Sequence, residues 1–250
     1  MNPFDLTGTT AVVTGGGRGL GAGISRSLLD AGADVVVMSR GDVPSELREH
    51  AAAAGGTIDH EQCDLASDGD IARAASAVLA RHQVDILVNN AGTQERYPAV
   101  EFPLEAWDRV LQVNLRSVFQ LCQLFGAPMV ERGEGAVVNV ASLLSFQGGI
   151  TVPAYAASKG AVAQLTKALC NEWAGRGVNV NAVAPGYMAT DMNEALLDDP
   201  VRSAQISSRI PAGRWGAPAD MGGAVVFLAS RAAAYVHGQV LAVDGGWLAR

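Results

Sequence analysis

Short runs of apolar, β-branched residues alternate along the chain with longer segments that are rich in alanine and leucine. Several of the short runs are apolar at nearly every position, which is typical of strands buried on both faces of a parallel sheet. The longer segments have the length and composition of helices. The predicted strands are Thr10–Thr14, Val35–Met38, Ile58–Cys63, Ile86–Asn89, Ala136–Ala141, Val178–Ala184 and Val240–Val243.

The predicted helices lie between these strands. This alternation predicts one α/β domain over residues 1–250, with a Rossmann-type, doubly wound parallel sheet of about seven strands and right-handed crossovers. The stretch Gly186–Gly213 interrupts the rhythm, and we expect an irregular substrate lid there because long loops inside compact domains are usually functional. The predicted helices are Leu20–Ala31, Ser45–Ala54, Asp68–His82, Leu104–Val130, Tyr155–Ala174 and Pro218–Ala229.

Composition narrows the classes of function. The net charge is −7 and no Lys/Arg run occurs, which disfavours nucleic acid as a partner because phosphate neutralisation dominates that affinity. No apolar run reaches the ~18 residues of a membrane helix, and the first residues show no signal-peptide pattern, so we expect no membrane partner and a cytoplasmic location. The three cysteines and four histidines are scattered and indicate no metal site. We expect each histidine to be a surface or packing residue.

The first predicted strand runs directly into a glycine-rich turn, and a helix follows. Glycine permits a tight turn and a close approach of the backbone to a pyrophosphate, while the free N–H groups and the dipole of the helix attract phosphate. The register TGxxxGxG, which starts at Thr14, fits this turn better than the window GxGxxA. The candidate cofactor-binding residues of the turn are Gly15, Gly17, Arg18, Gly19, Leu20 and Gly21.

A second set of residues has the chemistry for proton transfer. Tyr155 and Lys159 are one helical turn apart, so their side chains share one face of the helix. The ordinary pKa of tyrosine is too high for proton exchange near neutrality, and a nearby ammonium lowers it. Such a pair can move a proton on a hydroxyl or carbonyl while a hydride moves on carbon. Ser142 follows a predicted strand and can hydrogen-bond the substrate oxygen. Asn114 lies in a helix interior, where an amide is unfavourable and needs a reason.

In this order, these motifs resemble those of the short-chain dehydrogenase/reductase family over nearly the whole chain. The segment TGGGRGLG is similar to the cofactor loop of the family, and Asn89–Gly92 is similar to its NNAG motif. Asp64 matches the acid that holds the adenine amino group. Pro185, Gly186 and Thr190 match the segment on the nicotinamide side. The residues that match the catalytic tetrad are Asn114, Ser142, Tyr155 and Lys159.

The resemblance implies NAD(P)(H) as the cofactor and a role for each residue of the tetrad. Tyr155 would be the general acid/base, and Lys159 would bind the nicotinamide ribose and lower the pKa of Tyr155. Ser142 would orient the substrate, and Asn114 would hold a water molecule in a proton relay. The further implied cofactor contacts are Leu65, Asn90, Ala91 and Gly92.

Enzymes of this family are usually tetramers, so the resemblance also implies a homotetramer. The predicted helices Leu104–Val130 and Tyr155–Ala174 are rich in apolar residues and would supply one interface. The carboxyl-terminal segment would supply another.

Segments around the expected substrate pocket resemble those of family members that act on sugar acids from pectin and related uronate polymers. They imply hydride transfer between a nicotinamide cofactor and a sugar acid of the 2-dehydro-3-deoxy-D-gluconate or ketouronate type. The alternative enzymes are a gluconate 5-dehydrogenase, a uronate reductase and a 3-ketoacyl-carrier-protein reductase. The last has an acidic partner, and this acidic chain shows no basic docking patch. A non-catalytic nucleotide-sensing protein is disfavoured because Tyr155 and Lys159 are both present. These segments are Ser142–Ile150, Asn171–Ala174, Ala184–Thr190, Arg209–Gly216 and Val243–Arg250.

A sugar acid brings a carboxylate into a site that already holds an anionic cofactor, so the pocket needs a cation of its own. Arg96 is the only cation of the loop Thr93–Tyr97, which follows the NNAG motif, and we expect it to bind the substrate carboxylate. The alternative is a surface ion pair of Arg96 with Glu95 or Glu101.

Three further residues are expected at the substrate. Gln147 can hydrogen-bond sugar hydroxyls, while Tyr187 and Met192 can close over the substrate from the lid and exclude water. Arg214 is a second cation of this region, and we expect it to be structural.

The end of the second predicted strand slightly favours NADP over NAD. NAD enzymes of this fold have an acid there that binds the ribose 2′-OH, whereas this chain has Ser39 followed by Arg40. Arg40 can pair with a 2′-phosphate, and Arg18 can add a second positive charge. The alternative is that both arginines are solvated surface residues, with Arg40 at most stacked on adenine. The sugar-acid dehydrogenases that the chain resembles commonly use NAD.

Overall fold

Seven parallel strands form one sheet in the order β3-β2-β1-β4-β5-β6-β7 in this computed structural model, which describes residues 2–250. The chain changes direction across the sheet between β1 and β4, and ligands of open α/β sheets bind at such a switch point. The predicted doubly wound sheet is therefore confirmed. The strands are β1 (Thr10–Thr14), β2 (Asp34–Ser39), β3 (Ile58–Gln62), β4 (Ile86–Asn89), β5 (Gly135–Val140), β6 (Val178–Pro185) and β7 (Val240–Val243).

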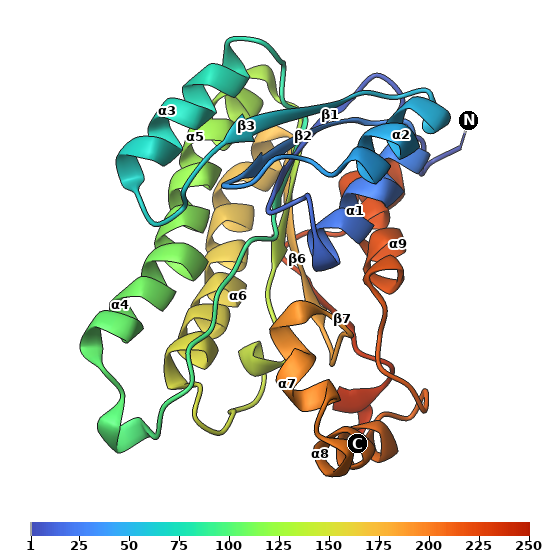
Figure 1. Cartoon of the computed structure of the whole chain (residues 1–250). Coiled ribbons are helices and arrows are strands. Elements are labelled where there is room, and N and C mark those ends of the chain that lie inside the picture. Colours follow the sequence, from blue (N-terminus) through green and yellow to red (C-terminus); the bar gives the residue numbers. More distant parts are fainter. Residues whose placement is uncertain (1) are drawn as a thin grey trace.

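Helices cover both faces of the sheet (Figure 1). One layer holds α1 (Gly19–Asp30), α2 (Ser45–Ala54) and α9 (Pro218–Ala229). The opposite layer holds α3 (Asp68–Leu79), α4 (Leu104–Leu111), α5 (Ser117–Arg132) and α6 (Pro153–Trp173). Short 3-10 turns occur at Ala99–Glu101, Leu143–Ser145, Ala174–Arg176, Asp191–Asn193, Arg231–Ala233 and Trp247–Ala249.

The alternation of side chains along each strand divides the core into two halves. Val13 of β1 packs toward α1 and α9, whereas its neighbour Val12 packs toward α3 and α5. Both side chains are fully buried. Because the central strands need apolar residues on both faces, they show the uninterrupted apolar pattern in the sequence. The edge strand β3 is more polar and only partly buried.

The predicted helix Leu104–Val130 is continuous in the structure, but a π turn interrupts its α-helical hydrogen bonding. Between α4 and α5, the residues Gln112–Arg116 form a π turn, in which one extra residue is accommodated in the helix. Such turns often occur at functional sites, and Asn114 lies within this one.

The prediction of an irregular stretch at Gly186–Gly213 is wrong for residues 194–209, which contain α7 (Glu194–Leu197) and α8 (Pro200–Arg209). Asp199 caps α8 by accepting hydrogen bonds from the backbone of Val201 and Arg202, and Pro200 occupies the first helical position. The sequence contains these signals for a helix start. However, α8 buries a single residue, Ile206, so no periodic apolar pattern follows them in the sequence.

Among residues 2–250, no helix has both the length and the apolar composition that a bilayer-spanning segment needs.

Candidate active site

The candidate residues come from segments far apart in the sequence and meet at the carboxyl ends of the strands. The glycine loop follows β1, the NNAG segment follows β4, Ser142 follows β5, and Gly186 follows β6. All these strands are parallel, so their carboxyl ends face the same edge of the sheet.

The glycine loop brings the end of β1 into contact with the start of α1. A Cβ atom at Gly21 would collide with the carbonyl oxygen of Gly15, so only glycine fits there. Gly15 itself has a φ of +63°, a conformation that glycine adopts without strain. At Gly17, by contrast, a Cβ atom would meet nothing closer than 3.4 Å, and the residue is partly exposed.

The NNAG segment braces this loop from the neighbouring strand. The Thr14 hydroxyl accepts hydrogen bonds from the backbone N–H groups of Asn90 and Ala91, both at 3.0 Å. The Asn90 side chain in turn donates to the Thr14 carbonyl at 2.8 Å. The β1 and β4 loops therefore form one hydrogen-bonded unit.

The amino end of α1 is suited to a phosphate. Among the described residues, no side chain caps it, and its first turn contains no acidic residue. Its first N–H groups remain available as donors for an anion. The partly exposed Gly17 and these donors fit the pyrophosphate of a dinucleotide. Arg18 is exposed and lies 3.8 Å from Asp191 in the segment after β6.

Asn114 ties the loop after β4 to α6. Its side-chain oxygen accepts from the Thr93 N–H, and its side-chain nitrogen donates to the Thr93 carbonyl, both at 2.8 Å. The same nitrogen donates to the Ser158 hydroxyl at 3.1 Å. The side chain is fully buried. These hydrogen bonds explain why an amide side chain lies inside a helix. Asn114 also lies within the π turn.

Lys159, Tyr155 and Ser142 gather beside this network. The Lys159 ammonium donates to the Val140 carbonyl at 2.6 Å and lies 5.7 Å from the centre of the Tyr155 ring. The Ser142 hydroxyl oxygen accepts from the Leu144 N–H at 3.2 Å, and its hydrogen bond with Tyr155 uses the hydroxyl proton. A Cβ atom at Gly92 would lie 3.6 Å from the Lys159 ammonium, so the NNAG segment reaches the same place.

Burial dominates the pKa values of the pair. It raises the pKa of the Tyr155 hydroxyl, and the hydrogen bond with Ser142 only partly offsets this effect. Burial also lowers the pKa of Lys159 to about 8. The expected net lowering of the Tyr155 pKa is therefore not seen in this state. The reason is that both groups are desolvated and the ammonium contacts the Val140 carbonyl instead of the phenol.

A chain of buried amides holds α6 in its place against the sheet. The Asn89 side chain of β4 donates to the Asn139 side chain of β5 at 2.9 Å, and Asn139 donates to the Thr166 hydroxyl of α6 at 3.0 Å. Because α6 carries Tyr155 and Lys159, these three polar residues position the catalytic pair. The sequence analysis did not assign Asn139 or Thr166, although a polar residue in an otherwise apolar strand is a signal that could have found Asn139.

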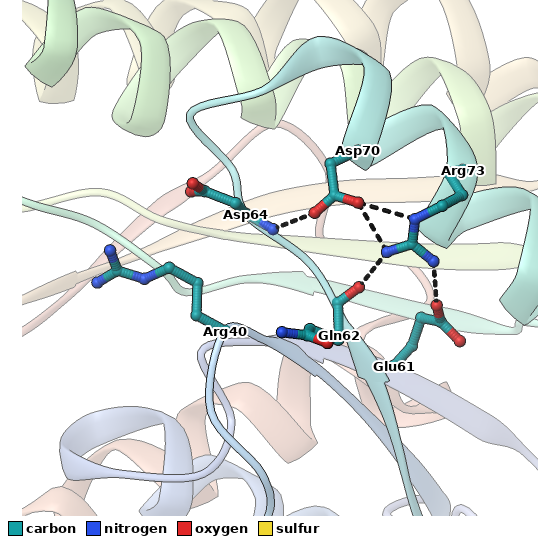
Figure 2. A pocket seen from close by; sticks show the side chains of 6 residues that line it. All are labelled: Arg40, Glu61, Gln62, Asp64, Asp70 and Arg73. Atoms are coloured by element: carbon teal, nitrogen blue, oxygen red, sulfur yellow. Dashed lines mark hydrogen bonds and ion pairs between the residues drawn. The ribbon is translucent and has the colours of Figure 1, made fainter.

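At the carboxyl ends of β2 and β3 lies a pocket of about 570 Å³ (Figure 2). The Arg73 guanidinium is fully engaged by Glu61 and Asp70, both at 2.8 Å, and by the Gln62 carbonyl. Among the described residues, Arg40 has no such partner and remains free to bind an anion. The Asp64 carboxylate is exposed and extends toward the same side as Arg40 (Figure 2). The residues that line this pocket are Arg40, Glu61, Gln62, Asp64, Asp70 and Arg73.

Two predicted cofactor contacts have a different environment. The Leu65 side chain is buried in the core below this pocket, so only its backbone is available to a cofactor. The Ser39 hydroxyl donates to the Gly41 carbonyl at 2.7 Å, which stabilises the turn after β2.

Thr190 lies beside the glycine loop, 3.9 Å from a Cβ atom built at Gly19.

Arg96 is exposed, and within residues 2–250 it forms no ion pair. Its sequence neighbour Glu95 binds the Arg109 guanidinium with two hydrogen bonds of 3.0 and 3.1 Å. The alternative ion pair of Arg96 with Glu95 is therefore wrong. The next residue, Tyr97, donates its N–H to the Thr151 carbonyl at 3.0 Å, which joins this loop to the segment before α6.

Aromatic residues from the carboxyl-terminal half enclose the opposite side of the site. Tyr187 lies between Trp215 and Trp247, with ring centres 5.4 and 4.6 Å away. The Trp247 indole N–H donates to the Gln147 side-chain oxygen at 3.3 Å. Tyr187 is therefore fixed by packing. Trp215 and Trp247 lie in the segments Arg209–Gly216 and Val243–Arg250, which the sequence analysis singled out without assigning either side chain.

Met192 differs from Tyr187 because its side chain is exposed. Its carbonyl accepts from the Gln94 side chain at 3.1 Å, so the segment after β6 touches the loop after β4. Arg214 binds Asp220 through two hydrogen bonds of 2.6 and 2.8 Å at the start of α9, which agrees with the expected structural role. This arginine also holds the pKa of Asp220 down to about 2.

Comparison with known proteins agrees with this geometry. A family model described as enoyl-(acyl carrier protein) reductase matches residues 15–248. A 2-dehydro-3-deoxy-D-gluconate 5-dehydrogenase of Bacillus subtilis is 51% identical over 99% of this chain and 97% of its own length.

Solved structures show the same likeness. A Beutenbergia cavernae protein described as an NAD(P)-dependent gluconate 5-dehydrogenase, with NADP bound at low occupancy, is 53% identical over all of both chains, with a TM-score of 0.96. An Agrobacterium tumefaciens protein described as a 2-deoxy-D-gluconate 3-dehydrogenase, with bound NADP, is 50% identical over all of both chains, with a TM-score of 0.94. The chain belongs to the short-chain dehydrogenase/reductase family and is an NAD(P)-dependent oxidoreductase that acts on CH–OH groups.

Proposed function

We propose that the enzyme oxidises the hydroxyl at carbon 5 of 2-dehydro-3-deoxy-D-gluconate, or reduces the corresponding ketone, and that it prefers NADP(H). Relatives that are about half identical over their full length carry this activity in their names. The observation that carries the proposal is the gathering of Asn114, Ser142, Tyr155 and Lys159 beside the glycine loop, with the unpaired Arg96 on the adjoining loop.

In the oxidising direction, Tyr155 takes the proton of the substrate hydroxyl while the C–H bond breaks and the C–O bond becomes a carbonyl. A bound NADP⁺ supplies the ring carbon that accepts the hydride. Ser142 directs its single hydroxyl proton to the Tyr155 oxygen before the substrate binds and turns it to the substrate oxygen afterwards, which holds the substrate beside the phenol. The proton on Tyr155 is then released to solvent through the polar network around Asn114.

Lys159 and Ser142 stabilise the phenolate that this step needs. Burial raises the pKa of Tyr155, so stabilisation must come from neighbouring charge and hydrogen bonds. The Ser142 hydrogen bond already acts in this direction. A turn of the Lys159 ammonium from the Val140 carbonyl toward the phenol and the ribose would add the charge.

Arg96 is proposed to bind the substrate carboxylate, and Gln147 to donate from its side-chain nitrogen to a sugar hydroxyl. The Gln147 oxygen is held by the Trp247 indole, which leaves the nitrogen as the available group. Tyr187 forms a fixed aromatic wall rather than a moving one.

The segment 186–213 is proposed as the substrate lid. Its first half touches both neighbouring loops, through Asp191 to Arg18 and through Met192 to Gln94. The exposed pair of Asp191 and Arg18 is a weak contact that costs little to break. The opening of the lid would then free Arg18 for a phosphate of the cofactor.

The homotetramer and the cytoplasmic location stay predictions. Exposed apolar side chains at Leu104 of α4 and Phe119 of α5 support the expected interface on these helices.

A substrate and cofactor panel tests the proposed function. We expect the highest kcat/KM with 2-dehydro-3-deoxy-D-gluconate, which the relatives' names indicate, and a lower value with other aldonates and ketouronates. A 3-ketoacyl thioester should be the poorest substrate, because it offers no carboxylate to Arg96. We expect a higher kcat/KM with NADP⁺ than with NAD⁺ for the same substrate. Among the described residues Arg40 has no ion-pair partner, and the end of β2 lacks the acid that selects NAD. Faster turnover of the thioester would refute the substrate class, and a tenfold preference for NAD⁺ would refute the cofactor argument.

Replacement of the phenol tests the catalytic role. In Tyr155→Phe, kcat should fall by at least about 100-fold, the low end of general acid–base catalysis, while the Kd for NADP⁺ stays within about twofold because the ring still packs. Lys159→Ala should impair both quantities. Steady-state kinetics and fluorescence titration measure them, and a Tyr155→Phe enzyme that keeps more than a tenth of the native kcat contradicts the assignment.

The carboxylate-binding role of Arg96 has a separate test. Arg96→Ala should raise KM for the sugar acid by roughly tenfold to a hundredfold, the loss of a charged hydrogen bond of about 1.5–3 kcal/mol, and should leave KM for the cofactor unchanged. The control is Arg176→Ala, because Arg176 is equally exposed but lies at the amino end of β6, across the sheet from the site. An unchanged substrate KM in Arg96→Ala removes this residue from the site.

A further inference from the structure

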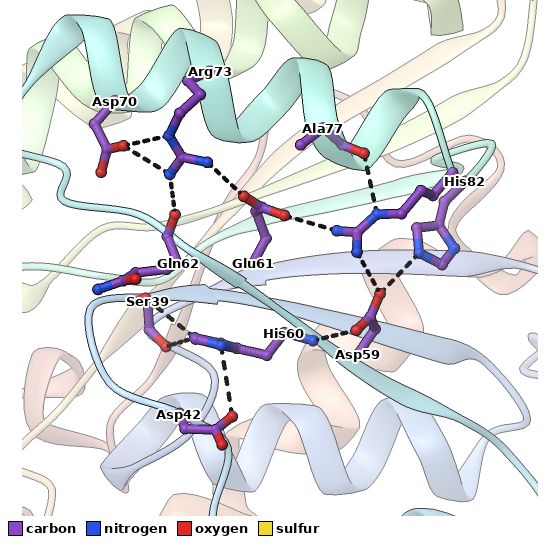
Figure 3. Close-up of polar contacts among 11 residues, drawn as sticks. Ser39, Asp42, Asp59, His60, Glu61, Gln62, Asp70, Arg73, Ala77 and His82 are labelled. Atoms are coloured by element: carbon purple, nitrogen blue, oxygen red, sulfur yellow. Dashed lines mark hydrogen bonds and ion pairs between the residues drawn. The ribbon is translucent and has the colours of Figure 1, made fainter.

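His60 of β3 lies under the turn that follows β2 (Figure 3). Its Nε2 atom is 3.2 Å from the Ser39 carbonyl oxygen and 3.3 Å from the Ser39 hydroxyl. Its Nδ1 atom is 3.6 Å from the Asp42 carboxylate. The side chain is only 17% exposed. His60 thus bridges the two ends of the Ser39–Asp42 turn.

This turn is the part of the protein that the 2′ position of the adenosine ribose reaches in this fold. It holds Arg40, whose side chain lines the pocket between the ends of β2 and β3 (Figure 2). The glycine loop lies against it, since a Cβ atom at Gly17 would be 3.6 Å from the Asp42 carbonyl oxygen. A change in the charge or position of the turn therefore acts directly on cofactor selection.

Both ring nitrogens of His60 face hydrogen-bond acceptors. The Ser39 carbonyl and the Asp42 carboxylate can only accept, and the Ser39 hydroxyl directs its proton to the Gly41 carbonyl. A neutral imidazole carries one proton, so one of its nitrogens would face an acceptor with a lone pair. The doubly protonated ring donates from Nε2 to Ser39 and places a positive charge 3.6 Å from the Asp42 carboxylate.

The other charged groups around His60 are already paired. Arg48 of α2 binds Asp42 at 2.6 Å. On β3 itself, the Asp59 carboxylate accepts from the His60 N–H at 2.8 Å and also pairs with Arg81 and His82.

The acids on the α3 side of β3 are paired as well. Glu61 binds Arg73 and Arg81, and Asp70 of α3 binds Arg73. Of these groups, His60 is therefore the one that contacts both ends of the Ser39–Asp42 turn.

We propose that His60 is a positioning residue for cofactor selection, which as an imidazolium clamps the Ser39–Asp42 turn and offsets the Asp42 carboxylate so that the turn accepts a 2′-phosphate. This inference rests on the proposed use of NADP. When the ring loses its proton, the clamp is incomplete and the Asp42 charge repels the phosphate more strongly. Selectivity for the 2′-phosphate is then lower at high pH than at low pH.

The test uses fragments of the cofactor rather than turnover. Adenosine 2′,5′-bisphosphate and AMP differ only at the 2′ position, and the ratio of their Kd values reports selectivity at the turn. Calorimetric titrations at about pH 6 and about pH 8 give this ratio for each protein. The 2′-phosphate has an ionisation of its own near pH 6, and a comparison of variants at the same two pH values removes its contribution.

Between about pH 6 and about pH 8, selectivity for the bisphosphate should fall in the native enzyme. This fall should be roughly threefold to tenfold larger than in His60→Gln, which corresponds to one unit charge acting across a partly solvated gap. The matched control is His82→Gln, because His82 also contacts Asp59 but not the turn. It should behave as the native enzyme does. A His60→Gln variant that keeps the native pH dependence overturns the inference.

A second variant keeps the test independent of any damage at position 60. Asp42 is exposed, and Asp42→Asn removes the charge that His60 offsets. Between pH 6 and pH 8, selectivity should change less in this variant than in the native enzyme, because the carboxylate that responds to His60 is absent, whereas a native pH dependence contradicts the proposal. Failure of the NADP assignment has a distinct signature: the native enzyme would bind AMP as tightly as the bisphosphate at both pH values.

Discussion

The close approach of Gly21 to the Gly15 carbonyl is the constraint on which the rest of the site depends. It brings the first turn of α1 against the end of β1, so that the uncapped N–H groups point into the space above the sheet. Thr14 and Asn90 then lock the neighbouring loop to the same strand end. The catalytic residues take their positions relative to this unit through Gly92, which lies beside Lys159 and Asn114.

The catalytic pair combines two opposed tendencies. Burial makes Tyr155 hard to ionise and Lys159 easy to deprotonate, so in this state each group resists the charge that catalysis assigns to it. The surrounding polar groups reverse this tendency only when the ammonium approaches the phenol. Cofactor and substrate binding would thereby couple to proton transfer, because both would bring charge and hydrogen bonds into a site where burial disfavours the Tyr155 phenolate.

The sequence predicted all seven strands and the order of motifs, because these follow from short-range patterns: apolar runs, glycine turns and helical spacing. The meeting of the tetrad was implied by the family resemblance. The sequence did not predict the helices within 186–213, where α8 buries too little apolar surface to show a periodic pattern. Nor did it predict the role of Asn139 or the location of His60. The contact of Asn139 with Thr166 and that of His60 with Ser39 join residues 27 and 21 positions apart. The unpaired state of Arg96 depends on Arg109, which binds Glu95 from the next helix, and no local pattern indicates that pairing.

The Kd for NADP⁺ of Gly21→Ala tests most directly whether the contact between β1 and α1 creates the cofactor site. The added Cβ meets backbone rather than a flexible side chain, so the strand end and the helix must separate. The account predicts at least a tenfold weaker Kd, while Gly223→Ala, whose Cβ enters open space in α9, binds NADP⁺ as the native enzyme does. Native affinity in a folded Gly21→Ala enzyme would contradict it.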